Sequence, residues 1–578
     1  MKKSLMGITV ILFLAVFLRF YDIKNVPPGL WSDEAMNGIN IIQALEGGQW
    51  KVFYHENFGR EGLFINIQAL FVKALGHEPW VLRLPSAIFG VLTVLGLYLM
   101  TKELFSWRVA AFSAFFMATS FWHINFSRIG FRAIMAPFFL VWGFYLLLKA
   151  IRKATKPQIL QDFSQRGGDD LPAGRQGLSN SPAGEYAGLE KFGSKTLFAF
   201  LSRPDVLMAF AGLVFGLGVH SYIAYRVAPL IALYPLWKFY KNQAEEVEPP
   251  LGGSTAKFCA PCLIVLFIFM ALVTTSPLLI YFAQNPADFF GRTSAISIFN
   301  SPNPIAQFSE NIAKTLQMFN FFGDFNWRHN FRGASQLWWP VGILFLLGIW
   351  ETLRRIKFAH KFILFWFFIM MLPVVISSEG LPHALRAIVL IPPAMIFAAL
   401  GLELLIGRIN MKFEKWEIDF PERKKQIHRI YKELKIVLFV FFIAVASNSF
   451  NQYFFRWAPK LEVYGSFHGD ITKIAHWLNN EPPNIKKYVV TNNTDSVDLT
   501  ERPQSFMPVV FITDTYFESK QRKKNIYYLG KNELDKIDCS AHCVIIPVES
   551  NPSIYEEIRQ KVPGINIKSD PGFIILEK

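Results

Sequence analysis

Residues 259–282 read CAPCLIVLFIFMALVTTSPLLIYF, an apolar run of 24 positions without a charged side chain. A helix of about 20 apolar residues crosses the hydrocarbon core of a bilayer. Comparable runs recur before residue 451, so the sequence predicts an all-α polytopic membrane protein with about eleven transmembrane helices. We expect the spans near residues 1–20, 80–101, 107–124, 132–151, 205–222, 226–240, 259–282, 337–353, 361–377, 385–406 and 434–450.

The overall composition agrees with lipid as the main solvent. Hydrophobic residues make up 52% of the 578 positions and charged residues only 18%, against roughly a quarter charged in soluble proteins. The net charge of +15 comes from Lys and Arg gathered in loops between apolar runs. Such loops set the orientation of a membrane protein. Because neither zinc-finger spacing nor an aromatic stacking platform accompanies the charge, we expect no nucleic-acid partner.

The basic loops predict how the chain is oriented. Lys and Arg concentrate in the expected loops 152–204, 241–258, 354–360 and 407–433, which places these loops and the N-terminus in the cytoplasm. An odd number of spans then leaves residues 451–578 outside the cytoplasm. We therefore expect a multi-pass protein of the plasma or inner membrane, with an uncleaved first helix.

The segments outside the spans predict two further features. Residues 153–200 are rich in Gly, Pro and Ser, which indicates a disordered cytoplasmic insertion in the transmembrane domain 1–450. The tail 451–578 reads as a small extracytoplasmic α/β domain. Its helical patterns lie at 471–478 and 553–561, and its β-type runs at 488–491, 508–513, 543–547 and 572–576.

The four cysteines form two closely spaced pairs. Cys539 and Cys543 lie in the tail and could form a disulfide if that domain is extracytoplasmic. Cys259 and Cys262 stand at the start of an apolar run, where they could form a redox motif or be two small residues near a helix end, and we favour the second interpretation.

The first outward loop, residues 22–79, carries the strongest chemical signal. It contains the sequence WSDEA at 31–35, followed by an amphipathic helical pattern. Ser32 or Asp33 could serve as the N-cap of that helix. The alternative is that Asp33 and Glu34 deprotonate an acceptor hydroxyl or amine at the membrane surface. Further polar residues of the loop are His55, Glu56, Arg60 and Glu61.

Three tight outward turns each combine His with Arg. They contain His123, Arg128 and Arg132; His220, Tyr222 and Arg226; and His383 and Arg386. Such residues are costly at lipid depth without anionic partners, and Arg guanidinium groups match phosphate oxygens. Snorkelling to lipid headgroups would explain any one turn. For the set of three we expect binding of a phosphate or pyrophosphate, which suggests group transfer from a polyprenyl-phosphate carrier.

The loop motif resembles that of a known family. The WSDEA segment after the first span is similar to the Asp-Glu motif of the C-type (GT-C) membrane glycosyltransferases, among them the protein O-mannosyltransferases and the lipid A aminoarabinose transferase. Residues 58–76, 80–86 and 382–388 also resemble that group, and the resemblance covers about residues 1–405. A Lys-Pro-Pro type segment is replaced by GREG at 59–62, which leaves the sugar and the acceptor open.

The resemblance implies an inverting transfer from a polyprenyl-phosphate sugar to a protein, lipid or glycan acceptor on the outer face of the membrane. Asp33 would be the general base, with Glu34 beside the donor sugar or the acceptor. The lipid phosphate would be bound by Arg128, Arg132, Arg226 and Arg386. The other expected substrate-binding residues are His55, Glu56, Arg60, Glu61, His123, His220, Tyr222 and His383. His55, Glu56 and Glu61 could hold a divalent ion or form an acceptor-binding face, and no metal is assigned.

Two other classes of function remain open from the sequence. A transporter or flippase would need ionisable residues inside its helices, whereas most spans here are uninterrupted runs of Phe, Leu and Ile. A non-catalytic scaffold with an outward partner-binding domain would leave the acidic loop and the His–Arg turns unexplained.

Overall fold

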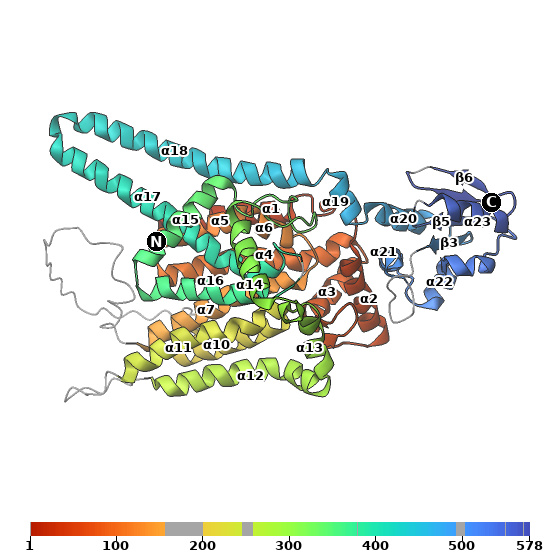
Figure 1. Cartoon of the computed structure of the whole chain (residues 1–578), viewed down its shortest axis with the longest axis horizontal. Helices are drawn as coiled ribbons and strands as arrows, with labels where there is room; N and C mark the ends of the chain where they lie inside the picture. Colours follow the sequence, from red (N-terminus) through yellow and green to blue (C-terminus); the bar gives the residue numbers. More distant parts are fainter. Residues whose placement is uncertain are drawn as a thin grey trace, which may run out of the picture.

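The computed structural model describes residues 2–155, 200–244, 258–378, 380–492, 503–549, 551–569 and 572–578. Long helices run side by side along the longest axis of the molecule (Figure 1). The N-terminus lies near one end of this bundle, and a small domain containing a β-sheet lies beyond the other end. Residues 156–199 of the expected insertion lie outside the described residues.

Each of the eleven predicted spans coincides with a helix. These are α1 (Lys2–Phe20), α4 (Pro79–Leu104), α5 (Trp107–Thr119), α7 (Met135–Ala154), α10 (Pro204–Leu217), α11 (Ala228–Ala244), α12 (Ala260–Gln284), α15 (Trp339–Arg354), α16 (Phe358–Val375), α17 (Ile391–Asp419) and α18 (Lys424–Phe450). Among the described residues, five helices are long and apolar enough to cross a membrane unaided. The predicted fold class, a helical membrane protein with a small C-terminal sheet domain, is confirmed.

Two details of the bundle differ from the sequence prediction. The span expected at 107–124 is broken at Ser120, whose hydroxyl accepts a bond from the backbone N–H of His123 and so starts α6 (Phe121–Phe126). The prediction of an irregular loop at 407–433 is wrong, because α17 and α18 extend into this segment and form a helical hairpin (Figure 1). Its Lys and Glu residues are good helix formers, so the helices continue where the hydrophobic run ends.

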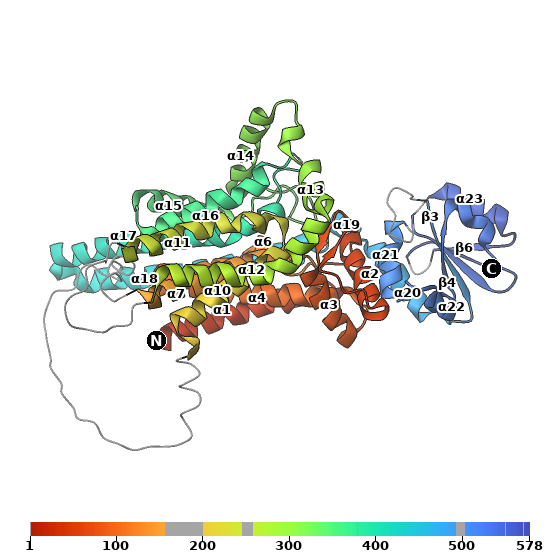
Figure 2. The ribbon, with the colours of Figure 1, turned by 90° about the horizontal axis from the view of Figure 1, so that it is seen from below.

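A layer of short elements covers the end of the bundle that faces the sheet domain (Figure 2). It contains α2 (Ser32–Gly47), the hairpin strands β1 (Phe53–Tyr54) and β2 (Arg60–Glu61), and α3 (Gly62–Leu75). Elsewhere, α13 (Pro286–Ala295) follows α12, and α14 (Pro304–Asn320) packs on α16 and stands out from the side of the bundle (Figure 2). The long first loop is therefore an ordered cap built on two helices.

The sheet of the C-terminal domain has the strand order β4-β3-β5-β7-β6. Its strands are β3 (Lys486–Thr491), β4 (Ile526–Gly530), β5 (Cys543–Pro547), β6 (Asn566–Lys568) and β7 (Ile575–Glu577), and its helices are α20 (Gly469–Asn480), α21 (Met507–Ile512), α22 (Glu518–Lys524) and α23 (Pro552–Lys561). β3 pairs in parallel with β4 and β5, whereas β7 is antiparallel to its neighbours.

Most elements expected in the tail are confirmed, but one is wrong. The β-type run at 508–513 forms helix α21, all six residues of which are buried. A short run that is apolar throughout has no period that separates strand from helix. Both cysteine pairs are disulfides, so Cys259 and Cys262 are bonded to each other and are not simply small residues.

The C-terminal domain packs directly on α2. Gln43 donates to the Tyr516 hydroxyl at 2.7 Å. A Cβ atom added to Gly38 would lie 2.3 Å from the Phe511 ring, so glycine allows this close approach. Residues 451–467 belong to the bundle instead, since Tyr453, Trp457 and Phe467 join its hydrophobic core. The domain that carries the sheet thus begins near α20.

Candidate active site

Asp33 stands in the first turn of α2. The capping hypothesis is wrong, because neither Ser32 nor Asp33 caps this helix. The Asp33 carboxylate accepts a hydrogen bond from the Asn57 side-chain amide at 2.9 Å. The Ser32 hydroxyl lies 3.1 Å from His468 Nε2. Asp33 is half-buried, so its carboxylate is held in place yet reachable from outside.

The loop that carries Asn57 has an unusual backbone. Asn57, Phe58 and Gly59 have φ angles of 49°, 63° and 80°, a region that residues other than glycine rarely adopt. For Asn57 and Phe58 such a conformation costs on the order of 1–3 kcal/mol each, and it persists where the surroundings impose it, often at functional sites. The β1–β2 pairing closes this loop and presents the amide of Asn57 to Asp33.

Glu34 is fully buried in an ion pair with Arg83. Its two oxygens each lie 3.0 Å from a guanidinium nitrogen of Arg83, and one also accepts the Gly130 backbone N–H at 2.7 Å. Arg83 donates further to the carbonyls of Pro27 and Gly29. These contacts join the loop before α2 to α4, so both Glu34 oxygens are already engaged.

Arg60 interacts electrostatically both with the Asp33 carboxylate and with the Arg132 guanidinium. It is buried and donates to the side-chain oxygens of Asn37 and Asn40, both at 2.5 Å. The pKa of Arg60 is lowered to about 10, chiefly by burial and also by the charge of Arg132, while the Asp33 carboxylate opposes that shift. Arg60 therefore adds positive charge next to Asp33.

Glu61 brings together two of the predicted Arg residues. Its carboxylate lies 2.7 Å from Arg132 Nε and 3.7 Å from an Arg226 guanidinium nitrogen. The Arg132 guanidinium also lies over the Tyr222 ring, 5.9 Å from its centroid. Burial raises the pKa of Glu61, but Arg132 and Arg226 outweigh it and lower the pKa overall. The two guanidinium groups thus share one carboxylate.

Glu61→Gln is expected to destabilise the fold by about 2 kcal/mol at neutral pH, because it removes a charged hydrogen-bond partner. A carboxyl whose pKa is lowered on folding stabilises above its unfolded pKa, about 4.3, and loses that effect as pH falls through the folded value. The gap in thermal unfolding midpoint between wild type and variant should therefore close in acid. Glu310→Gln, which breaks an exposed pair with Lys314, is the control; a gap independent of pH contradicts the assignment.

Three further predicted residues, His55, Glu56 and His220, have other surroundings. His55 is exposed and Glu56 pairs with Lys51, so His55, Glu56 and Glu61 do not gather into a metal-binding group. His220 Nε2 lies 2.8 Å from the Thr274 carbonyl.

The turn containing His123 and Arg128 is built into the bundle. Arg128 donates to the carbonyls of Leu18, Arg19 and Val26, and the His123 ring lies 2.6 Å from the Arg19 guanidinium. Backbone carbonyls thus surround the Arg128 guanidinium, where the sequence predicted an anion.

Sequence reasoning missed Arg328. Its guanidinium lies 3.7 Å from the centroid of the Trp31 ring. Burial lowers the pKa of Arg328, and the carboxylates of Asp33 and Asp324 oppose that shift. The signal that could have found it is the sequence WRH at 327–329, because positive-inside counting predicts few Arg residues in an outward loop.

The last predicted turn meets the Arg328 segment. The Ala384 backbone N–H donates to Asp324 at 2.8 Å, and the Asp324 carboxylate lies 3.1 Å from His329 and 3.9 Å from His383. Arg386 bonds to the Ser377 hydroxyl. His383 is thus joined to residues from a loop that the sequence did not single out.

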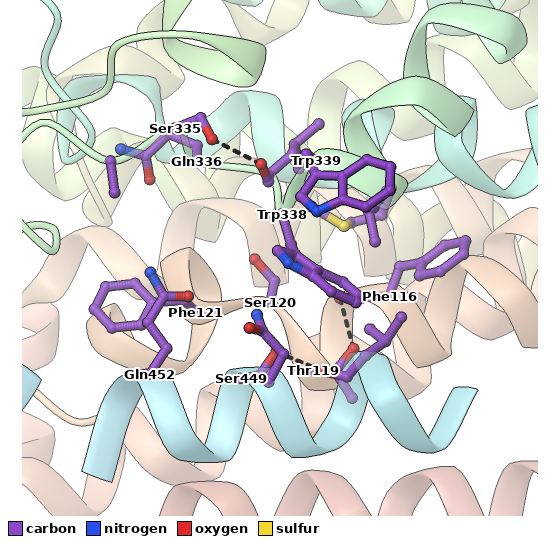
Figure 3. Close-up of a pocket in the computed structure, with 16 residues that line it drawn as sticks. Phe116, Thr119, Ser120, Phe121, Ser335, Gln336, Trp338, Trp339, Ser449 and Gln452 are labelled. Atoms are coloured by element: carbon purple, nitrogen blue, oxygen red, sulfur yellow. Dashed lines mark hydrogen bonds between the residues drawn. The ribbon is translucent and has the colours of Figure 1, made fainter. Parts of the chain in front are cut away.

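A cavity of about 220 Å³ lies elsewhere, between the end of α5, residues 334–339 and α18 (Figure 3). Trp338, Phe121 and Gln452 are among the side chains that line it. None of the residues predicted from the sequence to act at the site lines this cavity, so it is separate from the site around Asp33.

The architecture matches that of a known membrane enzyme. The crystal structure of ArnT from Cupriavidus metallidurans in the apo state superposes with a TM-score of 0.54, covering 99% of this chain and 97% of that one at 11% identity. The structure of the same protein bound to undecaprenyl phosphate gives a TM-score of 0.51 with the same coverage at 13% identity. The chain has the GT-C fold.

Two sequence comparisons each match part of this chain. Residues 63–160 of this GT-C chain match the family model described as dolichyl-phosphate-mannose-protein mannosyltransferase. The chain is also 28% identical over 173 residues to YkcB of Bacillus subtilis (strain 168), which carries the name of a mannosyltransferase. That alignment covers 28% of this chain and 23% of the relative. The resemblance to GT-C membrane glycosyltransferases expected from the sequence is confirmed.

Proposed function

We propose that this GT-C chain is an inverting glycosyltransferase that moves a sugar from a polyprenyl-phosphate donor to an acceptor outside the cytoplasm. The observation that carries the proposal is the half-buried Asp33 at the start of α2, held by Asn57 on a strained loop and flanked by Arg60 and Arg328. An ordered acid beside several cations suits a reaction in which a proton leaves one substrate and an anion leaves the other.

The proposed reaction needs one base to take a proton from the acceptor and cations to stabilise the departing phosphate. Asp33 takes the proton of an acceptor hydroxyl or amine, and the freed oxygen or nitrogen attacks the anomeric carbon of the donor sugar. The bond from that carbon to the lipid phosphate breaks, and the phosphate leaves with the electron pair. Because attack and departure occur on opposite faces of the carbon, the configuration inverts.

The cations divide into two roles in this proposal. Arg132, Arg226 and Arg386 interact with the departing phosphate, and Arg328 contacts the sugar or the acceptor next to Asp33. Arg128 and Glu34 are positioning residues, since the first is engaged by the end of α1 and the second by Arg83.

The remaining predicted residues complete the substrate-binding surface of the proposal. They are His55, Glu56, Arg60, Glu61, His220, Tyr222 and His383, whereas His123, which is fully buried against Arg19, is not part of that surface.

The orientation in this proposal is supported by the same arrangement. The N-terminus and the α17–α18 hairpin, which carries many Lys and Arg residues, lie near one end of the bundle (Figure 1). The sheet domain lies at the other end. Positive-inside counting then supports a cytoplasmic N-terminus and an extracytoplasmic C-terminal domain.

The experiment is sugar transfer by the purified full chain in lipid nanodiscs. A panel of radiolabelled polyprenyl-phosphate sugars is tested beside the corresponding nucleotide sugars, with candidate protein, lipid and glycan acceptors. We expect label on an acceptor from at least one lipid-linked donor, an inverted anomeric configuration in the product, and none from nucleotide sugars. Transfer from nucleotide sugars alone, or movement of the intact lipid donor across vesicles without transfer, overturns the proposal.

A further inference from the structure

Three side chains that the proposed reaction does not use as a set lie close together at the outward end of the bundle. Asp324 and His329 come from the segment between α14 and α15, and His383 comes from the turn before α17. One ligand atom from each residue lies within 4.8 Å of the other two. Two imidazoles and one carboxylate are a donor set that suits divalent ions of the zinc class.

The distances agree with such an ion. Zinc binds nitrogen and oxygen at about 2.0–2.2 Å, so neighbouring ligand atoms of a tetrahedral site lie about 3.4 Å apart. The Asp324 carboxylate oxygen lies 3.1 Å from His329 Nδ1 and 3.9 Å from His383 Nδ1, on either side of that value.

The carboxylate is also held in the way that metal-bound carboxylates usually are. One Asp324 oxygen accepts the Asn326 backbone N–H and the other accepts the Ala384 backbone N–H, both at 2.8 Å. Such outer hydrogen bonds orient a metal ligand and are part of most metal sites. Asp324 and His329 are buried, so the site is shaped by the fold rather than by a chance meeting at the surface.

A second group in the chain provides the contrast. Glu46, His77 and Asp514 also lie within reach of one another, but Lys520 pairs with both carboxylates, at 2.5 Å from Glu46 and 2.6 Å from Asp514. The Lys520 ammonium therefore already occupies the space between these two carboxylates and offsets their negative charge.

We propose that Asp324, His329 and His383 bind one divalent ion of the zinc class, with water completing the coordination. The ion joins the segment that carries Arg328 to the turn that carries Arg386, and thereby fixes the position of both cations. It is a positioning ion, and the proposal holds whether or not the chain transfers a sugar.

The test is metal binding by the full chain, purified in detergent through a tag without histidines and stripped with a chelator. Co²⁺ is the probe, because its visible absorption reports nitrogen and oxygen ligands, and Zn²⁺ is then added to displace it. We expect one ion per chain and a higher thermal unfolding midpoint with Zn²⁺. His329→Ala and His383→Ala should weaken binding by at least about 100-fold, since loss of an outer-shell partner alone costs 10–100-fold.

Two further variants make the result specific. Asp324→Asn keeps oxygen and size but loses the charge, and it should also lose the Co²⁺ spectrum while the chain stays folded. His77→Ala alters the Lys520-occupied group and should bind as the wild type does. The proposal is overturned if the folded wild type gives no Co²⁺ spectrum, or if His329→Ala and His77→Ala bind the ion equally, which would mark an adventitious ion only.

Discussion

Asp33→Asn is expected to lower the rate of sugar transfer by about 10²–10⁴-fold, the usual contribution of a general base. The change keeps the size of the side chain and its hydrogen-bonding partner Asn57, whose amide can rotate to suit the new group. It removes only the capacity to accept the acceptor's proton. The measurement is the single-turnover rate with saturating lipid-linked donor, so that binding of the donor does not limit the result.

The chain offers a matched control eleven positions upstream of Asp33. The exposed Asp22 accepts a hydrogen bond from the Asn25 amide at 2.6 Å, which is the same acid–amide pairing at a position outside the proposed site. Asp22→Asn should leave the rate unchanged. Equal rates for wild type and Asp33→Asn, with the fold intact by its unfolding midpoint, would remove Asp33 from the chemistry and leave it as a structural acid.

Glu34→Gln is expected to destabilise the protein by about 3–5 kcal/mol, because it leaves the buried Arg83 without its counter-charge. Both side chains have no exposure at all, so water cannot compensate the lost partner. Arg83 also holds the carbonyls of Pro27 and Gly29, and the start of α2 should loosen with it. The measurement is unfolding in one detergent, followed by intrinsic fluorescence.

A carboxylate on the same helix provides the comparison. Glu46 is exposed and pairs with Lys520 of the C-terminal domain, and exposed pairs contribute about 0–1 kcal/mol. Glu46→Gln should therefore lower stability only slightly. If the two variants unfold at the same point, the Glu34–Arg83 pair does not secure α2, and Glu34 becomes available for a direct role with substrate.

The C-terminal domain bears on both predictions through its contact with α2. Thr472 accepts the Leu30 backbone N–H at 2.8 Å, and His468 lies beside Ser32. The segment that presents Asp33 is thus fixed from outside by the tail as well as from inside by Arg83. These contacts make the tail part of the support of α2.

Sequence reasoning located the acidic loop because its residues are close together in the chain. Asp33, Glu34, Arg60 and Glu61 lie within 29 positions, and the pattern of an acid beside a predicted helix can be read locally. It could not say that Glu34 faces Arg83 while Asp33 faces Asn57. Adjacent residues on a helix point about 100° apart, and what each one meets depends on elements that pack later.

Arg328 marks the limit of that reasoning. It is separated from Trp31 by 297 positions, yet its guanidinium stacks on that ring. The WRH sequence could mark Arg328 as unusual, but no periodicity connects its loop with the loop of Trp31, so the sequence does not show that the two residues meet. Conversely Arg128, which its motif made attractive, is taken up by the carbonyls at the end of α1.

The sequence by itself determined the helical bundle at the eleven predicted spans and the loop that bears Asp33. Bilayer thickness dictates the length of an apolar run, and such a run can be recognised without knowing its neighbours. Only the tertiary structure decided the partners of each charge: Glu34 with Arg83, Glu61 with Arg132 and Arg226, and Asp324 with two histidines. These pairs join segments far apart in the chain, and their distances follow from how the helices pack rather than from any local pattern.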